Sequence, residues 1–327
     1  MKVMEQARAG APLTLTQRPD PSPPPGQVRL RIEACAVCRT DLHVVDGELP
    51  GLRYPRVPGH EAVGVIEAAG DGVDPALLGR RVGAAWLAHA CGRCEFCLAG
   101  QENLCDHADF NGYTRDGGFA SHMLADPEFL FDLPPGAPAA EIAPWLCAGL
   151  IGWRSLRATG QARRLGIYGF GSAGQILAQV CRWQGRSVYA FTRAGDLPAQ
   201  RHARTLGAAW AGDSTQDPPE PLDGAILFAP AGELVPRALA AVRKGGCVIC
   251  GGIHMSDIPS FPYRLLWGER TLASVANLTR ADGREFIEAA VAAGVRCKVR
   301  PYPLEQANQA LDDLRAGRIQ ATAVLVP

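Results

Sequence analysis

The sequence predicts an α/β protein with two domains, a small, partly open β-barrel and a doubly wound parallel sheet. The chain has 327 residues, which is more than a single hydrophobic core usually serves. In its first half, short β runs are separated by glycines, a pattern typical of a small barrel. In its second half, short apolar strands alternate with helical segments, which indicates a parallel sheet covered by helices.

The barrel is expected within residues 1–149. Residues 19–26 are rich in proline and continue neither a helix nor a central strand. Residues 28–34 then alternate apolar and charged side chains, which is the period of a half-buried strand leading directly to Cys35 and Cys38. Further short strands are expected at 63–70, 81–86 and 117–123.

The parallel sheet is expected within residues 150–279, and it begins with a dinucleotide motif. Residues 164–168 form an apolar strand that runs into G-x-G-x-x-G and then into an amphipathic helix. The first glycine allows a tight turn, the second lets a pyrophosphate approach the backbone, and the third lets helix and strand pack closely. The helix start offers unpaired N–H groups to the phosphates. The predicted cofactor-binding residues are Gly169, Gly171, Ser172, Ala173 and Gly174.

The next strand, 187–191, ends in Thr192-Arg193 rather than in the acid that usually binds the ribose of NAD. An arginine attracts a 2′-phosphate and a threonine can donate to it, so these two residues favour NADP. NAD remains the alternative, with the ribose held by backbone groups. Later elements are expected as strands at 225–228, 247–252, 272–275 and 321–326, and as helices at 282–293, with Asp282 as N-cap, and 305–316. Residues 280–327 are expected to return to the first domain.

Composition excludes several classes of partner. The chain has 33 basic and 33 acidic residues, which argues against nucleic acid or an anionic membrane as the main partner. No run approaches the length of a membrane span, and the N-terminal residues have no apolar signal core. A cytoplasmic protein is therefore expected.

The eleven cysteines point to metal rather than disulfides in such a protein. Four of them lie within fifteen residues, at a spacing that can wrap a tetrahedral, closed and therefore structural zinc. These are Cys91, Cys94, Cys97 and Cys105.

A second cluster is Cys38-Arg39-Thr40-Asp41-Leu42-His43, followed by Gly59-His60-Glu61 and by an isolated Cys147. Cys38, His60 and Cys147 make a Cys₂His set, the ligands of a catalytic zinc with one open position. Taken singly, Cys38 is better explained as a small buried hydrophobe and His60 as a core histidine. Their occurrence beside the other motifs favours the metal site.

In this order the motifs resemble the zinc-dependent alcohol dehydrogenases of the medium-chain dehydrogenase/reductase superfamily, over essentially the whole chain. The resemblance implies a GroES-like catalytic domain beside a Rossmann domain, two zinc ions per chain, and a homodimer or homotetramer. It implies hydride transfer between NAD(P) and an alcohol, either primary or small aliphatic or aromatic, giving the aldehyde.

The resemblance also assigns roles to single residues. Cys38, His60 and Cys147 match the catalytic zinc ligands, Glu61 a transient ligand, and Asp41 the carboxylate that orients the ligand histidine. Thr40 and His43 match a proton relay, Arg39 a contact to the cofactor pyrophosphate, and the four clustered cysteines the structural zinc site. Leu49 and Trp86 fall at substrate-pocket positions, although Trp86 is also interpretable as a plain core aromatic. Where the family often has a late arginine for the phosphates, residues 320–323 contain none.

Two other hypotheses remain open at this point. A zinc-free quinone or enoyl reductase of the same superfamily needs the dinucleotide loop but neither metal cluster. A non-catalytic zinc- and cofactor-binding protein needs both but turns over no substrate.

Overall fold

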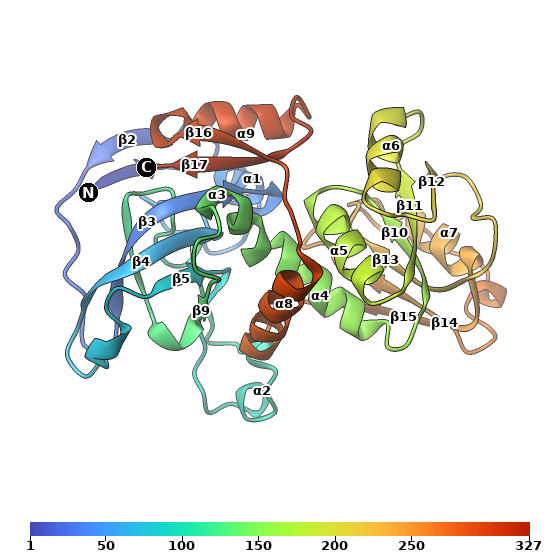
Figure 1. Ribbon diagram of the computed structural model, residues 1–327, viewed down its shortest axis with the longest axis horizontal. Coiled ribbons are helices and arrows are strands. Elements are labelled where there is room, and N and C mark those ends of the chain that lie inside the picture. The colour runs from blue at the N-terminus through green and yellow to red at the C-terminus, as the bar shows by residue number, and fades with distance from the viewer. The chain divides into compact units, whose positions relative to one another are not determined.

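The computed structural model describes residues 1–327, which form two compact units (Figure 1). The first unit contains residues 1–147, 278–287 and 296–327, and the second contains residues 148–277 and 288–295. The chain passes from the first unit to the second after residue 147 and returns after residue 277. Each of these positions is two residues before the boundary expected from the sequence, after 149 and after 279. Residues 288–295, which the sequence assigned to the first domain, belong to the second unit.

The first unit is built on a seven-stranded mixed sheet. Its main order is β16-β17-β3-β4-β5-β9, and β8 also pairs with β3. Two further sheets of two strands each, β1–β2 and β6–β7, belong to the same unit. The strands of the unit are β1 (Lys2–Glu5), β2 (Thr14–Gln17), β3 (Val28–Val37), β4 (Ala62–Ala69), β5 (Arg81–Ala84), β6 (Leu87–His89), β7 (Asp109–Phe110), β8 (His122–Ala125), β9 (Leu130–Asp132), β16 (Val299–Pro303) and β17 (Thr322–Val326). Its helices are α1 (Arg39–Asp46), α2 (Glu95–Leu98), α3 (Ala139–Ile142) and α9 (Ala307–Arg315), with 3₁₀ turns at Pro75–Leu77, Glu102–Leu104, Pro127–Phe129, Ala143–Leu146 and Leu304–Gln306.

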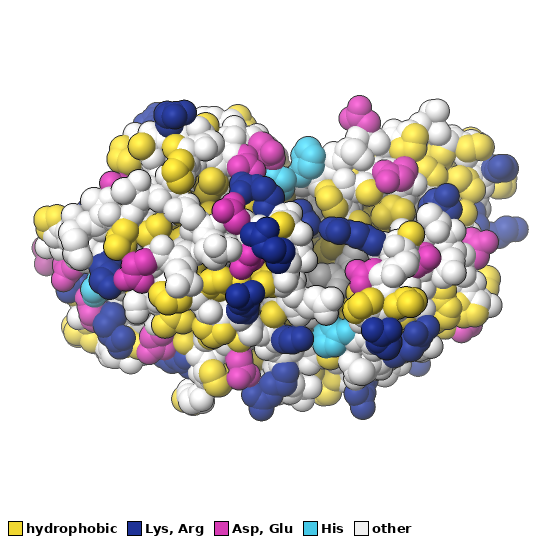
Figure 2. Space-filling model, turned by 90° about the horizontal axis from the view of Figure 1, so that it is seen from above, with side chains coloured by type: hydrophobic (Ala, Val, Ile, Leu, Met, Phe, Trp, Pro, Cys, Tyr) yellow, Lys and Arg dark blue, Asp and Glu magenta, His cyan; other side chains and the backbone are white.

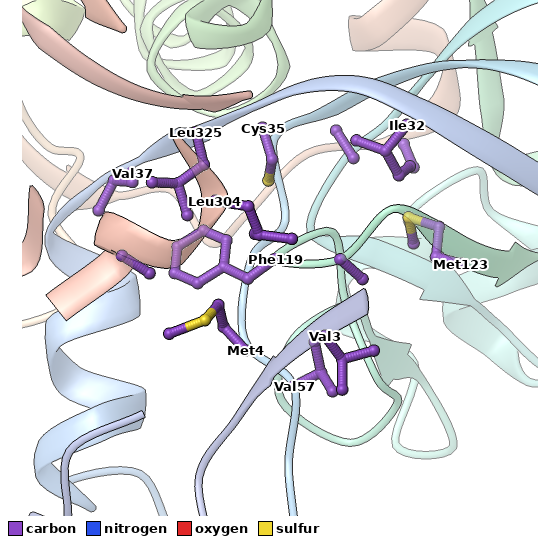
Figure 3. Close-up of a cluster of buried hydrophobic side chains, with 14 of the residues drawn as sticks. Val3, Met4, Ile32, Cys35, Val37, Val57, Phe119, Met123, Leu304 and Leu325 are labelled. Atoms are coloured by element: carbon purple, nitrogen blue, oxygen red, sulfur yellow. The ribbon is translucent and has the colours of Figure 1, made fainter. Parts of the chain in front are cut away.

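Strand β3 is the centre of this sheet. It pairs along one edge with β4, while β17 and β8 share the other edge, at its C-terminal and N-terminal ends respectively. Register shifts in the β3–β4 pair indicate bulges, which increase the local twist of a sheet. Phe119 is fully buried in the core beneath, among Met4, Leu304 and Leu325 (Figure 3).

The second unit is a six-stranded, wholly parallel sheet of order β12-β11-β10-β13-β14-β15. Its strands are β10 (Arg164–Tyr168), β11 (Ser187–Thr192), β12 (Trp210–Asp213), β13 (Leu222–Leu227), β14 (Val242–Cys250) and β15 (Thr271–Ser274). Its helices are α4 (Ala148–Ala158), α5 (Ser172–Trp183), α6 (Leu197–Thr205) and α7 (Leu234–Ala241), with a 3₁₀ turn at Tyr263–Leu265; α8 (Arg280–Ala293) is divided between the units. The predicted α/β class is confirmed.

The strand order reverses between β10 and β13. Helices α5 and α6 connect β10 to β11 and β11 to β12, towards one edge of the sheet, whereas α7 connects β13 to β14, towards the other edge. Because parallel crossovers are right-handed, α5 and α6 cover one face of the sheet and α7 covers the opposite face. Ligands of such sheets bind at the carboxyl ends of the strands where the order reverses. The loop after β10, which carries the glycine motif, lies at this point.

The start of α8 differs from the expectation. Its cap is Thr279, whose Oγ1 accepts the N–H of Asp282 at 3.1 Å, while the Asp282 carboxylate accepts the N–H of Thr279 at 2.9 Å. This reciprocal pair is a capping box three residues earlier than predicted, and Asp282 is its acidic partner rather than its N-cap.

The charges of the chain do not form a single patch on the face seen in Figure 2, where basic and acidic side chains are interspersed. This arrangement agrees with the equal numbers of basic and acidic residues. No helix combines the length and the apolar character that crossing a membrane requires.

A partly buried acid, Asp223, joins the starts of three strands in the second unit. The Asp223 carboxylate accepts four hydrogen bonds, from the N–H groups of Arg163 and Arg164 and from the guanidinium groups of Arg164 and Arg243, at 2.8–3.1 Å. Burial opposes the charge, but these donors outweigh it and hold the pKa of Asp223 well below its usual range. The ionised side chain therefore stabilises the start of the sheet.

We expect Asp223→Asn to lower the free energy of unfolding near neutral pH by about 1.5–3 kcal/mol, the range for hydrogen bonds to a charged group. Since the folded-state pKa is depressed, the stabilisation is present above the pKa of the unfolded chain, about 3.9, and is lost as the pH falls further. The difference from the wild type should therefore shrink below about pH 4. Urea denaturation near neutral pH and below about pH 4 measures this difference, with the variant Asp217→Asn, at an exposed residue, as control. Equal stability of the wild type and Asp223→Asn near neutral pH would contradict the role of Asp223.

Candidate active site

Four side chains of the first unit converge as a group that could hold a metal ion: Cys38, His60, Glu61 and Cys147. One ligand atom from each lies within 4.8 Å of every other. The Cys38 Sγ is 3.2 Å from His60 Nε2 and 4.0 Å from Cys147 Sγ. Two thiolates bonded at about 2.3 Å to one tetrahedral zinc lie about 3.8 Å apart, so the spacing suits this ion.

The junction of β3 and α1 positions Cys38 and His60 together. Cys38 caps the N-terminus of α1, and its Sγ accepts the N–H of Thr40 at 3.3 Å. The Asp41 side chain closes the cap, because one carboxylate oxygen accepts the Cys38 N–H at 2.9 Å. The other oxygen lies 3.0 Å from His60 Nδ1. His60 is therefore held as the Nδ1–H tautomer, and its Nε2 faces the Cys38 sulfur.

Gly59 fixes the backbone in front of His60. Its φ of +99° lies in the region that side chains avoid, and a Cβ there would come within 2.4 Å of the Phe119 ring and 2.7 Å of the Phe119 nitrogen. Because Phe119 is fully buried, it cannot move aside cheaply. The core of the first unit thus determines where the imidazole of His60 lies.

Glu61 supports the metal interpretation independently of the spacing. Its side chain is buried, and neither carboxylate oxygen has a hydrogen-bond partner. Burial, together with the nearby Cys38, raises the pKa of Glu61 well above its ordinary value, and the neighbouring Cys147 and burial do the same to the pKa of Cys38. Buried groups of this kind need a compensating charge, which a divalent cation provides.

The four-cysteine cluster forms a second group, in which all sulfur atoms lie within 4.8 Å of one another. The Cys105 Sγ accepts the N–H groups of Cys91 and His107, each at 3.4 Å. Backbone N–H groups of Arg93 and Cys94 lower the pKa of Cys91 to about 6, whereas burial and the neighbouring thiols raise the pKa of Cys97 to about 12. Four thiolates therefore coexist here only around a cation.

The glycine motif has the geometry that its spacing predicts. Gly169 has a φ of +94°, and a Cβ there would lie 2.7 Å from the nitrogen of Ala229, which comes just after β13. Gly174 packs against β10 and the turn after it, because its Cβ would lie 3.2 Å from the Ile167 side chain and 3.0 Å from the Gly169 oxygen. A Cβ at Gly171 would meet nothing within 4 Å, so the space in front of the α5 N-terminus is available to a phosphate. Ser172 and Ala173 begin α5.

At the end of β11, the two predicted cofactor-binding residues, Thr192 and Arg193, differ in their exposure to solvent. Thr192 is buried, and its hydroxyl donates to the carbonyl oxygens of Arg193 and Gly212 and accepts from Gln200 at 3.1 Å. Gln200 also donates to Asp213, which accepts the Gly195 N–H at 3.0 Å. Thr192 therefore supports the turn from inside, and the side chain presented to solvent is that of Arg193.

The residues predicted for proton transfer, and Arg39, predicted to contact the cofactor pyrophosphate, lie on α1. Arg39 is its exposed first residue, Thr40 follows, and His43 lies one turn further on. The His43 Nδ1 is 2.5 Å from a carboxylate oxygen of Glu48, a residue that the sequence analysis did not single out. The glycine at 47 is the signal that could have indicated this contact, since a glycine helix stop brings residues 43 and 48 together.

Trp86 lies beside the first metal-binding group. Its ring meets His60 edge-on, with centroids 5.0 Å apart, and stacks on Phe110 and Tyr113 at 5.3 and 5.7 Å. The Tyr113 hydroxyl donates to the carbonyl of Pro50, which follows Leu49. Sequence reasoning missed Phe110 and Tyr113, because only the fold brings them to Trp86.

Comparisons with known proteins agree with this geometry. The family model of the alcohol dehydrogenase GroES-like domain matches residues 24–135. The chain is 45% identical over 314 residues to "Probable alcohol dehydrogenase AdhA" of Mycobacterium tuberculosis, covering 94% of this chain and 90% of that protein. It is 34% identical over 335 residues to an alcohol dehydrogenase of Geobacillus stearothermophilus, covering 99% and 98%. A solved acetophenone reductase of Geotrichum candidum, in complex with NAD, is 26% identical with a TM-score of 0.89, covering 100% and 97%.

The fold and the two cation-binding groups define a zinc-type dehydrogenase with a GroES-like part and a Rossmann-like parallel sheet. The chain belongs to the alcohol dehydrogenases that contain a GroES-like domain.

We expect the purified protein to contain two zinc ions per chain, one in each group, and Cys38→Ser to lose one zinc and nearly all turnover. The matched variant Cys97→Ser should lose the other zinc, since both changes replace one thiolate of a four-residue group. Elemental analysis together with alcohol-oxidation assays tests this. A Cys38→Ser protein that keeps two zinc ions and its activity would reject the assignment.

Proposed function

We propose that this chain is an NAD(P)-dependent alcohol dehydrogenase with one catalytic and one structural zinc per chain. The observation that carries the proposal is the group of Cys38, His60, Glu61 and Cys147, in which the imidazole is oriented by a buried acid and the two carboxylate oxygens of Glu61 lack a hydrogen-bond partner. Such a set binds zinc through two thiolates and an imidazole and leaves a position for substrate. In this proposal residues 1–149 form the catalytic domain, residues 150–279 form the dinucleotide-binding domain, and residues 280–327 return to the first domain except for 288–295, which lie in the second unit.

A zinc ion held by Cys38, His60 and Cys147 would supply a Lewis acid that lowers the pKa of an alcohol hydroxyl. Asp41 keeps the His60 ring in place, and the Thr40 hydroxyl takes the substrate proton, which His43 passes to solvent. A bound nicotinamide cofactor would supply the acceptor for the hydride that the alcohol carbon loses as the aldehyde forms. Arg39 and the start of α5 bind the phosphates.

The proposed substrates are primary alcohols, or small aliphatic or aromatic ones. Support comes from the stacked rings of Trp86, Phe110 and Tyr113, which form an apolar aromatic wall beside His60. The experiment is a panel of such alcohols and their aldehydes in both directions, with NAD and with NADP. Full zinc and cofactor binding without turnover would favour the non-catalytic hypothesis, and turnover without zinc the zinc-free reductase.

We favour NADP over NAD on the geometry at the end of β11. Arg193 is exposed and makes no ion pair, and no acid occupies the ribose position. The nearest acid in the network, Asp213, is engaged by Gly195 and Gln200. A guanidinium placed there can pair with a 2′-phosphate in two parallel hydrogen bonds.

Arg193→Ala should lower kcat/KM for NADP by about 10- to 100-fold, because it removes a hydrogen bond to a charged group, whose energy corresponds to a change of this size. The kcat/KM for NAD should stay nearly unchanged. Arg163→Ala is the matched control, because Arg163 is also exposed but precedes β10, at the opposite end of the sheet. Steady-state kinetics with both cofactors decide the point. A wild-type enzyme with a much higher kcat/KM for NAD would overturn the preference.

We further propose a homodimer or homotetramer joined through β15. This strand is at the edge of the parallel sheet, and its sequence, Thr271-Leu272-Ala273-Ser274, contains no charge or proline to discourage pairing. The large side chains of Tyr263 and Trp267, just before the strand, are each more than two-thirds exposed. Uncharged edges and exposed aromatics of this kind are typical of subunit interfaces.

Sedimentation velocity should show a dimer or tetramer, and Ala273→Asp should shift it towards a smaller species, because two such edges would place like charges opposite each other. Trp183→Asp, at another exposed aromatic of the second unit, should leave assembly unchanged. A monomeric wild-type protein, or assembly unaffected by Ala273→Asp, would contradict the β15 interface.

A further inference from the structure

The contact between His43 and Glu48 has no role in the function proposed above. Glu48 lies just beyond the end of α1, and its carboxylate is 2.5 Å from His43 Nδ1. The Glu48 side chain is about half exposed, whereas that of His43 is mostly covered. The acid is thus the solvent-facing member of the pair.

The backbone builds this contact. Gly47 ends α1 with a φ of +76°; its N–H bonds the Val44 carbonyl at 3.1 Å, and the Glu48 N–H bonds the His43 carbonyl at 3.0 Å. This pair of bonds is a Schellman motif, which places the side chain of the residue after the glycine against that of the residue five positions earlier. The contact is usually apolar, but here it joins a carboxylate to an imidazole.

The turn at Gly47 depends on glycine and does not easily accept another residue at this position. A Cβ at Gly47 would lie 2.5 Å from the Ala9 Cβ, in a backbone conformation that side chains rarely adopt. The same residue that stops the helix therefore also maintains the His43–Glu48 contact.

The other charges at this helix end have different partners. Asp46 pairs with Arg315 of α9 at 2.7 Å, and Arg315 also contacts Asp312. Asp46 and Glu48 are two residues apart and carry the same charge, but the hydrogen bond to the imidazole comes from Glu48. This difference separates a specific contact from a general effect of nearby charge.

We propose that Glu48 is a positioning residue of the proton path, which accepts the Nδ1–H of His43 and leaves Nε2 as the nitrogen that receives the proton. The inference rests on the proposed function, in which His43 is the outer end of that path. When Nε2 gains the proton, the ring becomes a cation facing the carboxylate, and it returns to neutral by losing a proton to water or buffer. The same pairing of an acid with a histidine orients the ring in other proton-transfer sites.

The test compares Glu48→Gln, His43→Ala, the double variant and the control Asp46→Asn as purified enzymes in alcohol oxidation. We expect Glu48→Gln to lower kcat by about 5-fold, the scale of one hydrogen bond, with little change in KM. Added imidazole buffer should restore the rate of both single variants, since it replaces the missing proton acceptor. Glu48→Gln should have no further effect in the His43→Ala background, and Asp46→Asn should behave as the wild type.

The outcomes separate the two proposals. If His43→Ala turns over normally, the proton path and the role of Glu48 both fail. If His43→Ala is slow but Glu48→Gln is not, or if the two effects multiply in the double variant, His43 keeps its role and Glu48 loses it. Melting temperatures of the variants show whether a lower rate reflects unfolding, and a rate loss in Glu48→Gln that follows its melting temperature and resists imidazole would also overturn the inference.

Discussion

The candidate active site depends on the buried carboxylate of Asp41. One of its oxygens completes the N-cap of α1 and the other holds the His60 ring. Both side chains are about 1% exposed, so neither group has water as an alternative partner. The start of a helix and the orientation of an imidazole are therefore coupled through one residue. A change at Asp41 would disturb the cap, the tautomer of His60 and the position of Cys38 together.

Helix α1 is stabilised by interactions at both of its ends. With eight residues it is too short to be stable alone, so its capping interactions and its packing hold it. The capping box places Cys38 at one end, and the glycine stop places Glu48 against His43 at the other. At 1.5 Å per residue, the backbones of Cys38 and His43 lie roughly 8 Å apart along the axis. The proposed metal ligand and the proposed proton exit are thus separated by a rigid length of helix.

The features that the sequence predicted well are local ones. The strand, glycine motif and helix at 164–183 are contiguous, so their order alone indicated the dinucleotide site. The metal-binding groups were indicated by residue type, because thiols and imidazoles at such spacing have few other uses. The contacts of Trp86 with Phe110 and Tyr113, and the burial of Thr192 by Gln200, depend on separate elements meeting in space. Nothing in the local pattern indicates such contacts, and the roles of Thr40, His43, Leu49 and Arg39 remain predictions.

The two cation-binding groups differ in how they stabilise negative charge. In the cysteine lobe, backbone N–H groups already favour the thiolate of Cys91, whose pKa is lowered to about 6. In the other group Glu61 is buried without a donor, and its pKa is raised well above the ordinary value by burial first and by Cys38 next. Both groups reach their full negative charge only with a cation present, but in the lobe the backbone donors already favour one of the thiolates. A Cys₂His ligand set leaves one position of such an ion open to a further oxygen ligand, which is the property that an alcohol dehydrogenase requires.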